Sequence, residues 1–344
     1  MKKTILALSL LFAGCTTHIA GNLNPRSPEK LPQEITTAVD ITNENSIVTF
    51  VNNNQVEDDT LAVYLVGDQD NTPLLKFRYL KSTVEITGKR DLIVIYNILK
   101  DKHQIVAGLM ADALMNKGFD CIIVNQEFFL EKPSRWVRPI VSDSKSPFRF
   151  DSDKLGYDDY NIHLARGVKH IIERWVPLNK RLSGRYGFVG VSMGGMHAIG
   201  AAALFPDSVM TVAIMAGGDN VELFKTSEEK LLVDNREALF DLYAAKLTKL
   251  HPDVRVDWEQ RVYDDIGKLK FQILELAKTV QTDRVKLMIT LNDVSVPTAT
   301  QWRLFVALGG PEARLFPCGH YSMALYYFSI KWQLQEWMTR AFAR

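Results

Sequence analysis

The chain has 344 residues, of which 47% are hydrophobic and 24% are charged, and its formal net charge at pH 7 is +1. A chain of this length and composition can bury the core of one large globular domain, because the buried share of the surface rises with chain length. The balanced charge, without a run of Lys or Arg, argues against nucleic acid as a partner.

The first residues predict an export signal. Lys2 and Lys3 precede an apolar segment over residues 5–13, which at about nine residues is too short to span a bilayer core of about 30 Å. Residues 12–15, Phe-Ala-Gly-Cys, resemble the lipobox of bacterial lipoproteins, in which the cysteine receives a lipid and becomes the new N-terminus. An ordinary secretory signal peptide is the alternative, since Phe12 replaces the usual leucine.

This resemblance implies a signal peptide over residues 1–15 and an exported lipoprotein of the bacterial cell envelope, held to a membrane by the lipid on Cys15. Thr16 supplies no acidic retention signal, so the implied destination is the outer membrane, facing the periplasm or the cell surface. Residues 16–34 are rich in proline and poor in apolar side chains, and we expect a flexible tether there, before a globular domain over 35–344.

The start of that domain is rich in predicted strands. Short runs with β-branched or aromatic residues, separated by Asn- and Asp-rich turns, occupy residues 47–51, 61–66, 74–80 and 83–87. We expect these runs to form antiparallel strands.

Strands and helices then alternate. Residues 92–96 are apolar throughout, as in a strand covered on both faces. A helix predicted over 103–117 and a strand over 121–125 follow. This succession favours a right-handed parallel crossover.

Residues 186–205 predict a buried strand followed by a helix of small residues, over 186–191 and 196–205. The intervening Gly-Val-Ser-Met-Gly-Gly fits the G-x-S-x-G nucleophile elbow. Such a sharp turn strains the backbone of the central Ser192, and the residues two before and two after it pass so close that only small residues fit. The serine hydroxyl then stands beside the free N–H groups of the helix. The glycine spacing does not fit a dinucleotide fingerprint or a P-loop.

After a strand predicted over 209–215, a charged segment interrupts the alternation. Helix-spaced apolar residues within it predict helices over 228–250 and 258–280. We expect residues 220–283 to form a helical insertion that caps Ser192, with Phe224 and Leu232 lining an acyl pocket. Extra packing without contact to substrate is the alternative.

The sheet resumes after the insertion. The predicted elements are a strand over 285–291, a helix over 298–308, a strand over 313–316 and a helix over 321–342. Asp293 follows the first of these strands, and His320 follows the second. Because the carboxyl ends of parallel strands share one edge of a sheet, we expect Ser192, Asp293 and His320 to gather there.

Serine, acid and histidine in this order, each after a parallel strand, resemble the arrangement in α/β-hydrolase serine esterases and lipases. GVSMGG, NDVSVP and CGHYSMA are similar to the three catalytic loops of that superfamily, and the resemblance covers roughly residues 83–344. It implies an α/β fold of the α/β-hydrolase type: a mostly parallel central sheet, antiparallel opening strands and a helical cap insertion.

The same resemblance implies Ser192 as nucleophile, His320 as base and Asp293 as acid. Asp219 is an alternative acid, because some lipases of this fold carry theirs after the preceding strand. We favour Asp293, since Val296-Pro297 also matches the usual pattern.

Backbone N–H groups of Met193 and Ile98 would form the oxyanion hole. Most such esterases have His-Gly after the strand over 92–96, where this chain has Asn97-Ile98. Because the donor is a main-chain amide, a side chain is tolerated if the path of the loop is kept.

The implied activity is hydrolysis of a small-molecule or lipid carboxylic ester through an acyl-enzyme, without a cofactor. Three alternatives remain: a serine peptidase or amidase, an inactive lipoprotein of the same fold that acts in binding, and, disfavoured by the glycine spacing, a dinucleotide-binding protein. No metal is expected. His163 and His170 lie two turns apart on a helix predicted over 158–175, whereas a pair of metal ligands on a helix lies on adjacent turns, so we expect both histidines to lie on the surface.

The fold also bears on the remaining cysteines, Cys121 and Cys318. An exported pair could form a disulfide. In the usual strand order of this fold they lie about five strands, or about 24 Å, apart. A disulfide requires Cα atoms within about 7 Å, so we expect two free thiols.

Overall fold

The structure is a computed structural model that describes residues 16–22, 26–43, 46–51, 58–65, 75–98, 104–125, 157–250 and 257–343. The predicted signal peptide, Cys15 included, lies outside the described residues, as does Leu99.

A single sheet runs through the described residues in the order β1-β10-β9-β8-β7-β5-β6-β4-β3-β2. Its strands are β1 (Thr17–Ile19), β2 (Ser46–Val51), β3 (Asp58–Leu65), β4 (Leu75–Leu80), β5 (Arg90–Tyr96), β6 (Asp120–Asn125), β7 (Leu182–Val191), β8 (Thr211–Ile214), β9 (Val285–Thr290) and β10 (Glu312–Phe316). From β10 to β6 all neighbours are parallel, and β4, β3 and β2 continue the sheet antiparallel. The prediction of a mostly parallel sheet with antiparallel opening strands is confirmed.

Helices cover both faces of the sheet. They are α2 (Gln33–Ala38), α3 (Ile105–Met115), α5 (Tyr157–His170), α6 (Met193–Leu204), α7 (Asn220–Thr226), α8 (Lys230–Leu250), α9 (Trp258–Ile266), α10 (Ile273–Lys278), α11 (Thr298–Ala307) and α12 (Tyr327–Phe342). Shorter helical turns are the π-helical Ile171–Trp175 and the 3-10 segments Val176–Leu178, Thr282–Arg284 and η5 (Tyr321–Tyr326).

Alternation along the strands divides the core into two layers. In β5, Ile93 and Ile95 pack with α3 and α12. Leu92, Val94 and Tyr96 face the opposite side, where they pack with α5 and α6. Successive side chains of a strand point to opposite faces, so a strand covered on both sides must be apolar throughout, as this one is.

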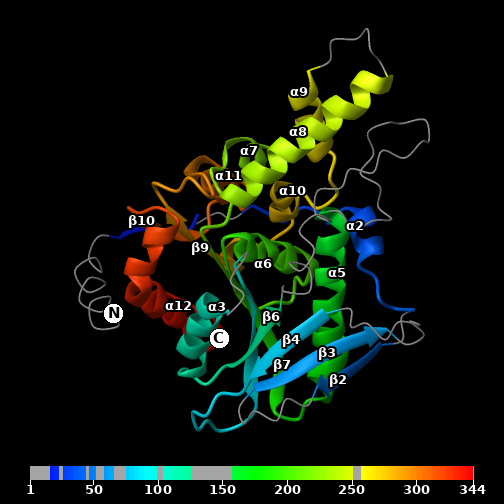
Figure 1. Cartoon of the computed structure of the whole chain (residues 1–344). Helices are drawn as coiled ribbons and strands as arrows, with labels where there is room; N and C mark the ends of the chain where they lie inside the picture. Colours follow the sequence, from blue (N-terminus) through cyan, green and yellow to red (C-terminus); the bar gives the residue numbers. More distant parts are fainter. Residues whose placement is uncertain are drawn as a thin grey trace.

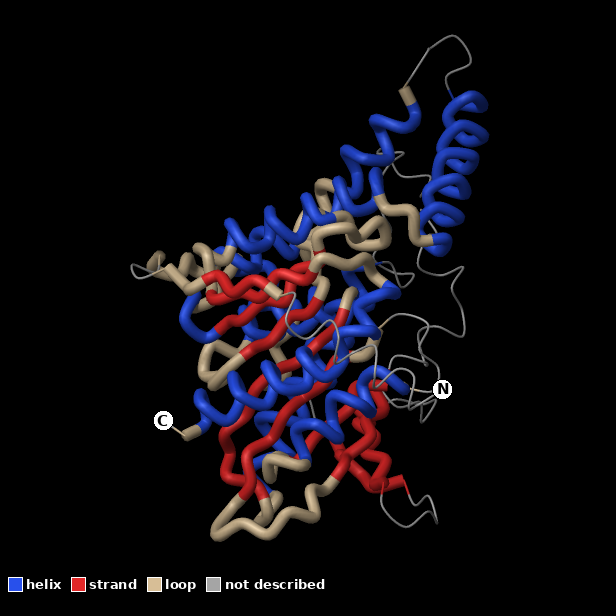
Figure 2. The backbone as a smooth tube through the Cα atoms, turned by 90° about the vertical axis from the view of Figure 1, so that its left-hand side faces the viewer, coloured by secondary structure: helices blue, strands red, loops and turns tan. Residues whose placement is uncertain are grey.

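The insertion between β8 and β9 is helical, as predicted. In both views of the backbone, the far ends of α8 and α9 project beyond the sheet layers (Figures 1 and 2). Leu239 and Tyr243 of α8 pack on Val262 and Ile266 of α9 as a small separate core, and Phe224 packs against it. Phe224 therefore contributes to the packing of the insertion itself.

None of the helices in the described part of the chain has the length and apolar composition that crossing a bilayer requires.

Two predicted elements are wrong, because side chains from outside each segment take over its backbone hydrogen bonds. Residues 83–87 form no strand: the N–H of Val84 donates to Ser82 Oγ at 3.2 Å, its carbonyl accepts from the Arg90 side chain, and β4 pairs directly with β6. The helix predicted over 258–280 is broken between α9 and α10. There the Asp158 carboxylate accepts from the N–H groups of Lys270 and Phe271 at 2.8 and 2.9 Å.

Part of the expected tether is ordered. Thr17–Ile19 form β1, which pairs antiparallel with Leu315, Arg314 and Ala313 of β10. A short strand of this kind covers the exposed edge of a sheet. Flexibility over the whole of residues 16–34 is therefore a wrong prediction.

At the amino-terminal edge of the parallel strands, a buried carboxylate joins the opening strands to the central sheet. Asp120, at the start of β6, is fully buried. It accepts hydrogen bonds from Arg181 Nε at 2.6 Å and from Tyr79 Oη at 2.7 Å. Arg181 in turn donates to the carbonyl of Ser82 at 2.6 Å. The Asp120 side chain thus connects β4, the segment after it, β6 and the residue that precedes β7.

This arrangement predicts a large stability effect for Asp120→Ala. The substitution removes the buried acceptor of Arg181 Nε, the Tyr79 hydroxyl and the Ser82 N–H, and we expect the free energy of unfolding to fall by about 3–5 kcal/mol in urea titrations. Asp112→Ala, which removes an exposed carboxylate on α3, is the matched control and should change it by no more than about 0.5 kcal/mol. Equal effects of the two substitutions would contradict the prediction.

Candidate active site

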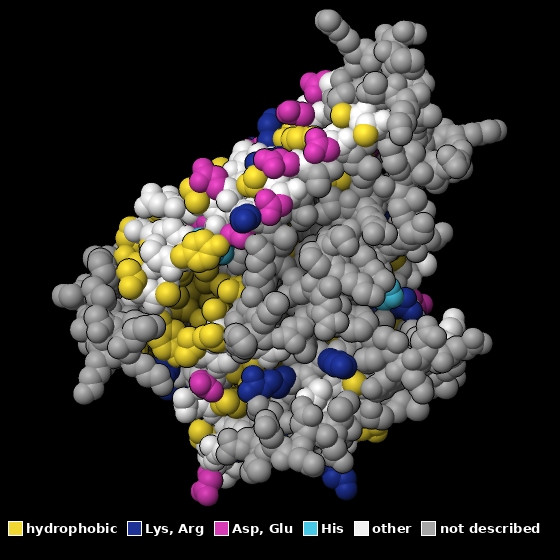
Figure 3. Space-filling view, in the orientation of Figure 1, with side chains coloured by type: hydrophobic (Ala, Val, Ile, Leu, Met, Phe, Trp, Pro, Cys, Tyr) yellow, Lys and Arg dark blue, Asp and Glu magenta, His cyan; other side chains and the backbone are white. Residues whose placement is uncertain are grey.

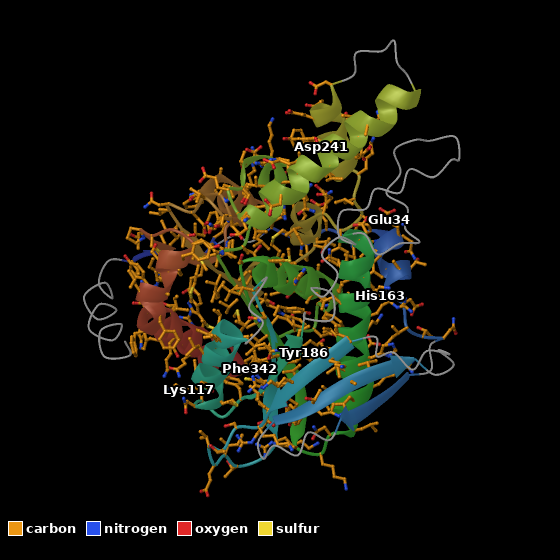
Figure 4. All side chains as sticks on the ribbon, in the orientation of Figure 1. Glu34, Lys117, His163, Tyr186, Asp241 and Phe342 are labelled. Carbon is orange, nitrogen blue, oxygen red and sulfur yellow. The ribbon has the colours of Figure 1, made fainter. Side chains whose placement is uncertain are left out.

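Ser192 occupies the turn between β7 and α6 in a strained conformation. Its backbone angles are φ 57° and ψ −123°, a region that residues with a side chain rarely adopt. Tyr186 of β7 lies in the lower half of the molecule and Asp241 of the insertion at the opposite end (Figure 4). The helix α6, which begins directly after Ser192, lies between β7 and the insertion helices α7 and α8 (Figure 1), so β7 runs toward the side from which the insertion projects.

Glycines permit the turn because backbone segments meet where side chains would be. A Cβ on Gly190 would lie 1.9 Å from the carbonyl oxygen of Gly194. A Cβ on Gly194 would lie 2.3 Å from the carbonyl oxygen of Tyr96 and 2.4 Å from that of Asn97. These contacts are far inside van der Waals distance, so both positions exclude a side chain, as the sequence motif predicts.

The same contact brings the loop after β5 against the first turn of α6. Met193 is the first residue of this helix, where backbone N–H groups have no acceptor within the helix. Ile98, one residue beyond Asn97, packs partly buried against the core under α3. The two expected oxyanion donors are thus in adjoining backbone segments.

His320 and Asp293 form a hydrogen-bonded pair. The distance from His320 Nδ1 to Asp293 Oδ2 is 2.9 Å. The Asp293 side chain is fully buried, and that of His320 is 13% exposed. This arrangement leaves Nε2 as the ring nitrogen that can exchange a proton with a substrate or nucleophile.

Both oxygens of Asp293 are held by further donors. Oδ1 accepts from the N–H groups of Ser295 at 3.0 Å and Val296 at 2.9 Å. Oδ2 accepts from Thr290 Oγ1 at 2.9 Å and Gln301 Nε2 at 3.3 Å. The carboxylate is therefore fixed in orientation. The Asp-x-Ser spacing is a turn signal that sequence reasoning missed, whereas Gln301 enters the site only through the placement of α11.

Asp219, the alternative acid, has other partners. Its Oδ1 caps α7 by accepting from the N–H of Glu222 at 2.9 Å. Its Oδ2 pairs with Arg303 of α11. Of the two candidate acids, Asp293 alone is bonded to His320.

Hydrogen bonds connect the carboxyl ends of four neighbouring strands. The N–H of Ser192 donates to the Ile214 carbonyl at 2.8 Å, that of Met215 to Met288 at 2.8 Å, and that of Leu291 to Phe316 at 3.0 Å. Ser192, Asp293 and His320 accordingly follow β7, β9 and β10 at one sheet edge. Within the described residues, the Ser192 hydroxyl makes no direct hydrogen bond to His320.

Among the described histidines, two are buried. His197, in α6, is 3% exposed beside the Tyr96 ring, and burial lowers its pKa to about 3. His170 is fully buried at the end of α5, and burial lowers its pKa to about 4. The prediction that His170 lies on the surface is wrong. Among the described residues, no group of three or more His, Cys, Asp or Glu could hold a metal ion.

The two thiols are free and buried, as expected. Cys121 lies in β6 and Cys318 follows β10, five strands away in the sheet order. Burial, with a smaller contribution from the Asp293 charge, raises the pKa of Cys318 to about 12. This thiol is therefore a neutral packing group next to the His320 loop.

No protein-family model matches this sequence, and no curated protein matches it either. Solved structures do resemble the chain. The acetyl xylan esterase from Paenibacillus sp. R4 superposes with a TM-score of 0.61 at 16% identity, covering 90% of this chain and 96% of the esterase. Est1E from Butyrivibrio proteoclasticus gives a TM-score of 0.52 at 11% identity, covering 80% of this chain and 98% of its own.

Acetyl xylan esterase 1 from Thermoanaerobacterium sp. JW/SL YS485 superposes with a TM-score of 0.50 at 16% identity, covering 95% of this chain and 98% of the esterase. At such low identities the likeness establishes the fold alone. Together with the strand order, the elbow and the helical insertion, it shows that this chain has the fold of the α/β-hydrolases.

Proposed function

We propose that the protein is a serine hydrolase that cleaves a carboxylic ester through Ser192, His320 and Asp293. The observation that carries this proposal is the His320–Asp293 pair, 2.9 Å apart and held by four further donors, at the sheet edge that also bears the strained Ser192. Esterases of the same fold add support.

The mechanism follows from the hydrogen bonds of the histidine. With Nδ1 engaged by Asp293, Nε2 accepts the proton of the Ser192 hydroxyl as the serine oxygen attacks the ester carbonyl. The N–H groups of Met193 and Ile98 stabilise the resulting oxyanion. His320 then returns the proton to the leaving alcohol, which departs and leaves an acyl-serine. Water, activated by the same imidazole, releases the acid and restores the serine.

The surface beside the catalytic loops favours an apolar substrate. Hydrophobic side chains gather in a hollow over α3, η5 and α12 (Figure 3). On α3, Ile105 is 61% and Leu109 37% exposed, and Tyr321 at the start of η5 is 75% exposed. These elements directly follow the Ile98 and His320 loops, so an apolar acyl or alcohol group can rest there while its ester reaches Ser192.

A fluorophosphonate probe tests the proposal without knowledge of the natural substrate, because it reacts only with a serine that has both an activating base and oxyanion donors. We expect covalent labelling of Ser192, its loss in Ser192→Ala, and nearly complete loss in His320→Ala, each followed by intact-protein mass spectrometry. A folded wild-type protein that neither labels nor cleaves a short-chain aryl ester would identify the chain as an inactive binding protein.

The choice of acid has its own test. Asp293→Asn should lower kcat for an aryl ester by a factor of about 10³ to 10⁴ with little change in KM, because the imidazole loses the partner that fixes its tautomer. Asp219→Asn is the matched control, since it changes the same charge on a neighbouring loop, and should retain most activity. A large loss in Asp219→Asn alone would reverse the assignment.

We also propose that residues 1–15 direct export and that Cys15 carries a lipid that anchors the protein to the outer membrane. The support is the charged start, the short apolar segment and the lipobox-like Phe-Ala-Gly-Cys. Radioactive palmitate should label the wild type and Cys121→Ala equally, and Cys15→Ser should abolish labelling and partition into detergent. Recovery of soluble wild-type protein that is cleaved at another site would exclude the anchor.

A further inference from the structure

The segment between α7 and α8 is bonded to the loop that carries Asp293. Between α7 and α8, the Ser227 hydroxyl donates to the Ser295 carbonyl at 2.5 Å. The N–H of Glu228 donates to the Val294 carbonyl at 2.9 Å. Ser295 itself donates its N–H to Asp293. The insertion therefore contacts the catalytic acid loop through main-chain and side-chain bonds, although its far end projects away from the sheet.

The next residue, Glu229, reaches the histidine loop as well. Its Oε2 accepts a hydrogen bond from Tyr321 Oη at 2.6 Å and a longer one from Ser295 Oγ at 3.4 Å. Tyr321 follows His320 in the chain, and the two rings stand edge to face with centroids 5.5 Å apart. A closed circuit of contacts thus runs from Asp293 through Ser295, Glu229 and Tyr321 to His320.

Tyr321 depends on this carboxylate for its position. The residue is 75% exposed, so packing restrains its ring only weakly, whereas a hydrogen bond from a phenol to a carboxylate is short and strong. The hydrogen bond to Glu229 also raises the pKa of Tyr321, which keeps the hydroxyl protonated and able to donate.

The imidazole has one freedom that Asp293 does not remove. A single hydrogen bond at Nδ1 fixes the direction of that atom, but it does not by itself set the tilt of the ring about the line joining Nδ1 to Oδ2. A tilt swings Nε2 away from Ser192, and displacements of about 1 Å can cost about 10² in rate. The Tyr321 ring stands against the imidazole and limits this tilt.

We propose that Glu229 is a positioning residue for His320, which it orients by holding Tyr321 against the imidazole. The inference rests on the proposed function, since it concerns the same site. It gives the insertion a role in catalysis that does not require the insertion to cover the substrate.

Rates of fluorophosphonate labelling, and kcat and KM for an aryl ester, test the inference in the full-length protein. Glu229→Ala and Tyr321→Phe should each lower the labelling rate and kcat by about tenfold with KM nearly unchanged. The loss in the double variant should be well below the product of the two single losses, because both substitutions remove the same bond between Tyr321 and Glu229. Glu229→Gln, whose amide oxygen can still accept from Tyr321, should recover much of the loss. Glu228→Ala removes an exposed carboxylate one residue earlier and should label at the wild-type rate.

The outcomes separate the two proposals. If the wild type labels and Glu229→Ala labels equally fast, the positioning role is overturned while the proposed function stands. Additive losses in the double variant would also overturn it. If Glu229→Ala has a lower melting temperature, Tyr321→Phe becomes the deciding variant, because it keeps the aromatic ring and removes only the hydroxyl. A wild-type labelling rate in Tyr321→Phe would overturn the positioning role. Failure of the wild type to label would overturn both proposals.

Discussion

The architecture of the site depends on one steric constraint, the approach of the first turn of α6 to the ends of β5 and β7. Gly190 and Gly194 have no side chains, and the backbone atoms of Gly194, Tyr96 and Asn97 occupy the space that Cβ atoms would need. This approach forces the backbone of Ser192 into its strained conformation and places the start of the helix beside the loop after β5. The proposed nucleophile, Ser192, and the proposed main-chain donors of Met193 and Ile98 therefore come from a single contact between backbone segments.

The parallel sheet brings residues from other parts of the chain to the same edge as this turn. Because β7, β8, β9 and β10 are neighbours and parallel, the loops after them open on one edge, and residues from distant parts of the chain meet there. The opposite edge is joined to the opening strands by the buried Asp120 and its partners. Polar side chains thus lie at both ends of the parallel strands, around Asp120 at one edge and around Asp293 at the other.

The insertion combines two kinds of structure. Its outer part, where α8 packs on α9, has a small core of its own. Its inner end is bonded to the Asp293 loop through Ser227 and to the His320 loop through Glu229. A segment inserted between two strands can therefore contact a site at their ends through a few residues between two of its helices, because Ser227 and Glu229 lie beside the loops that carry Asp293 and His320.

The sequence by itself determined what depends on local sterics and periodicity: the elbow at Ser192, the alternation of strands and helices, and the placement of Asp293 and His320 directly after strands. Only the tertiary structure decided which groups surround them. Gln301 and Thr290 hold the Asp293 carboxylate, Asp158 accepts from the backbone N–H of Phe271 more than a hundred residues away, and Glu229 meets Tyr321 across 92 positions. Single hydrogen bonds between distant residues leave no periodic signal in a sequence, since their partners are chosen by how whole elements pack.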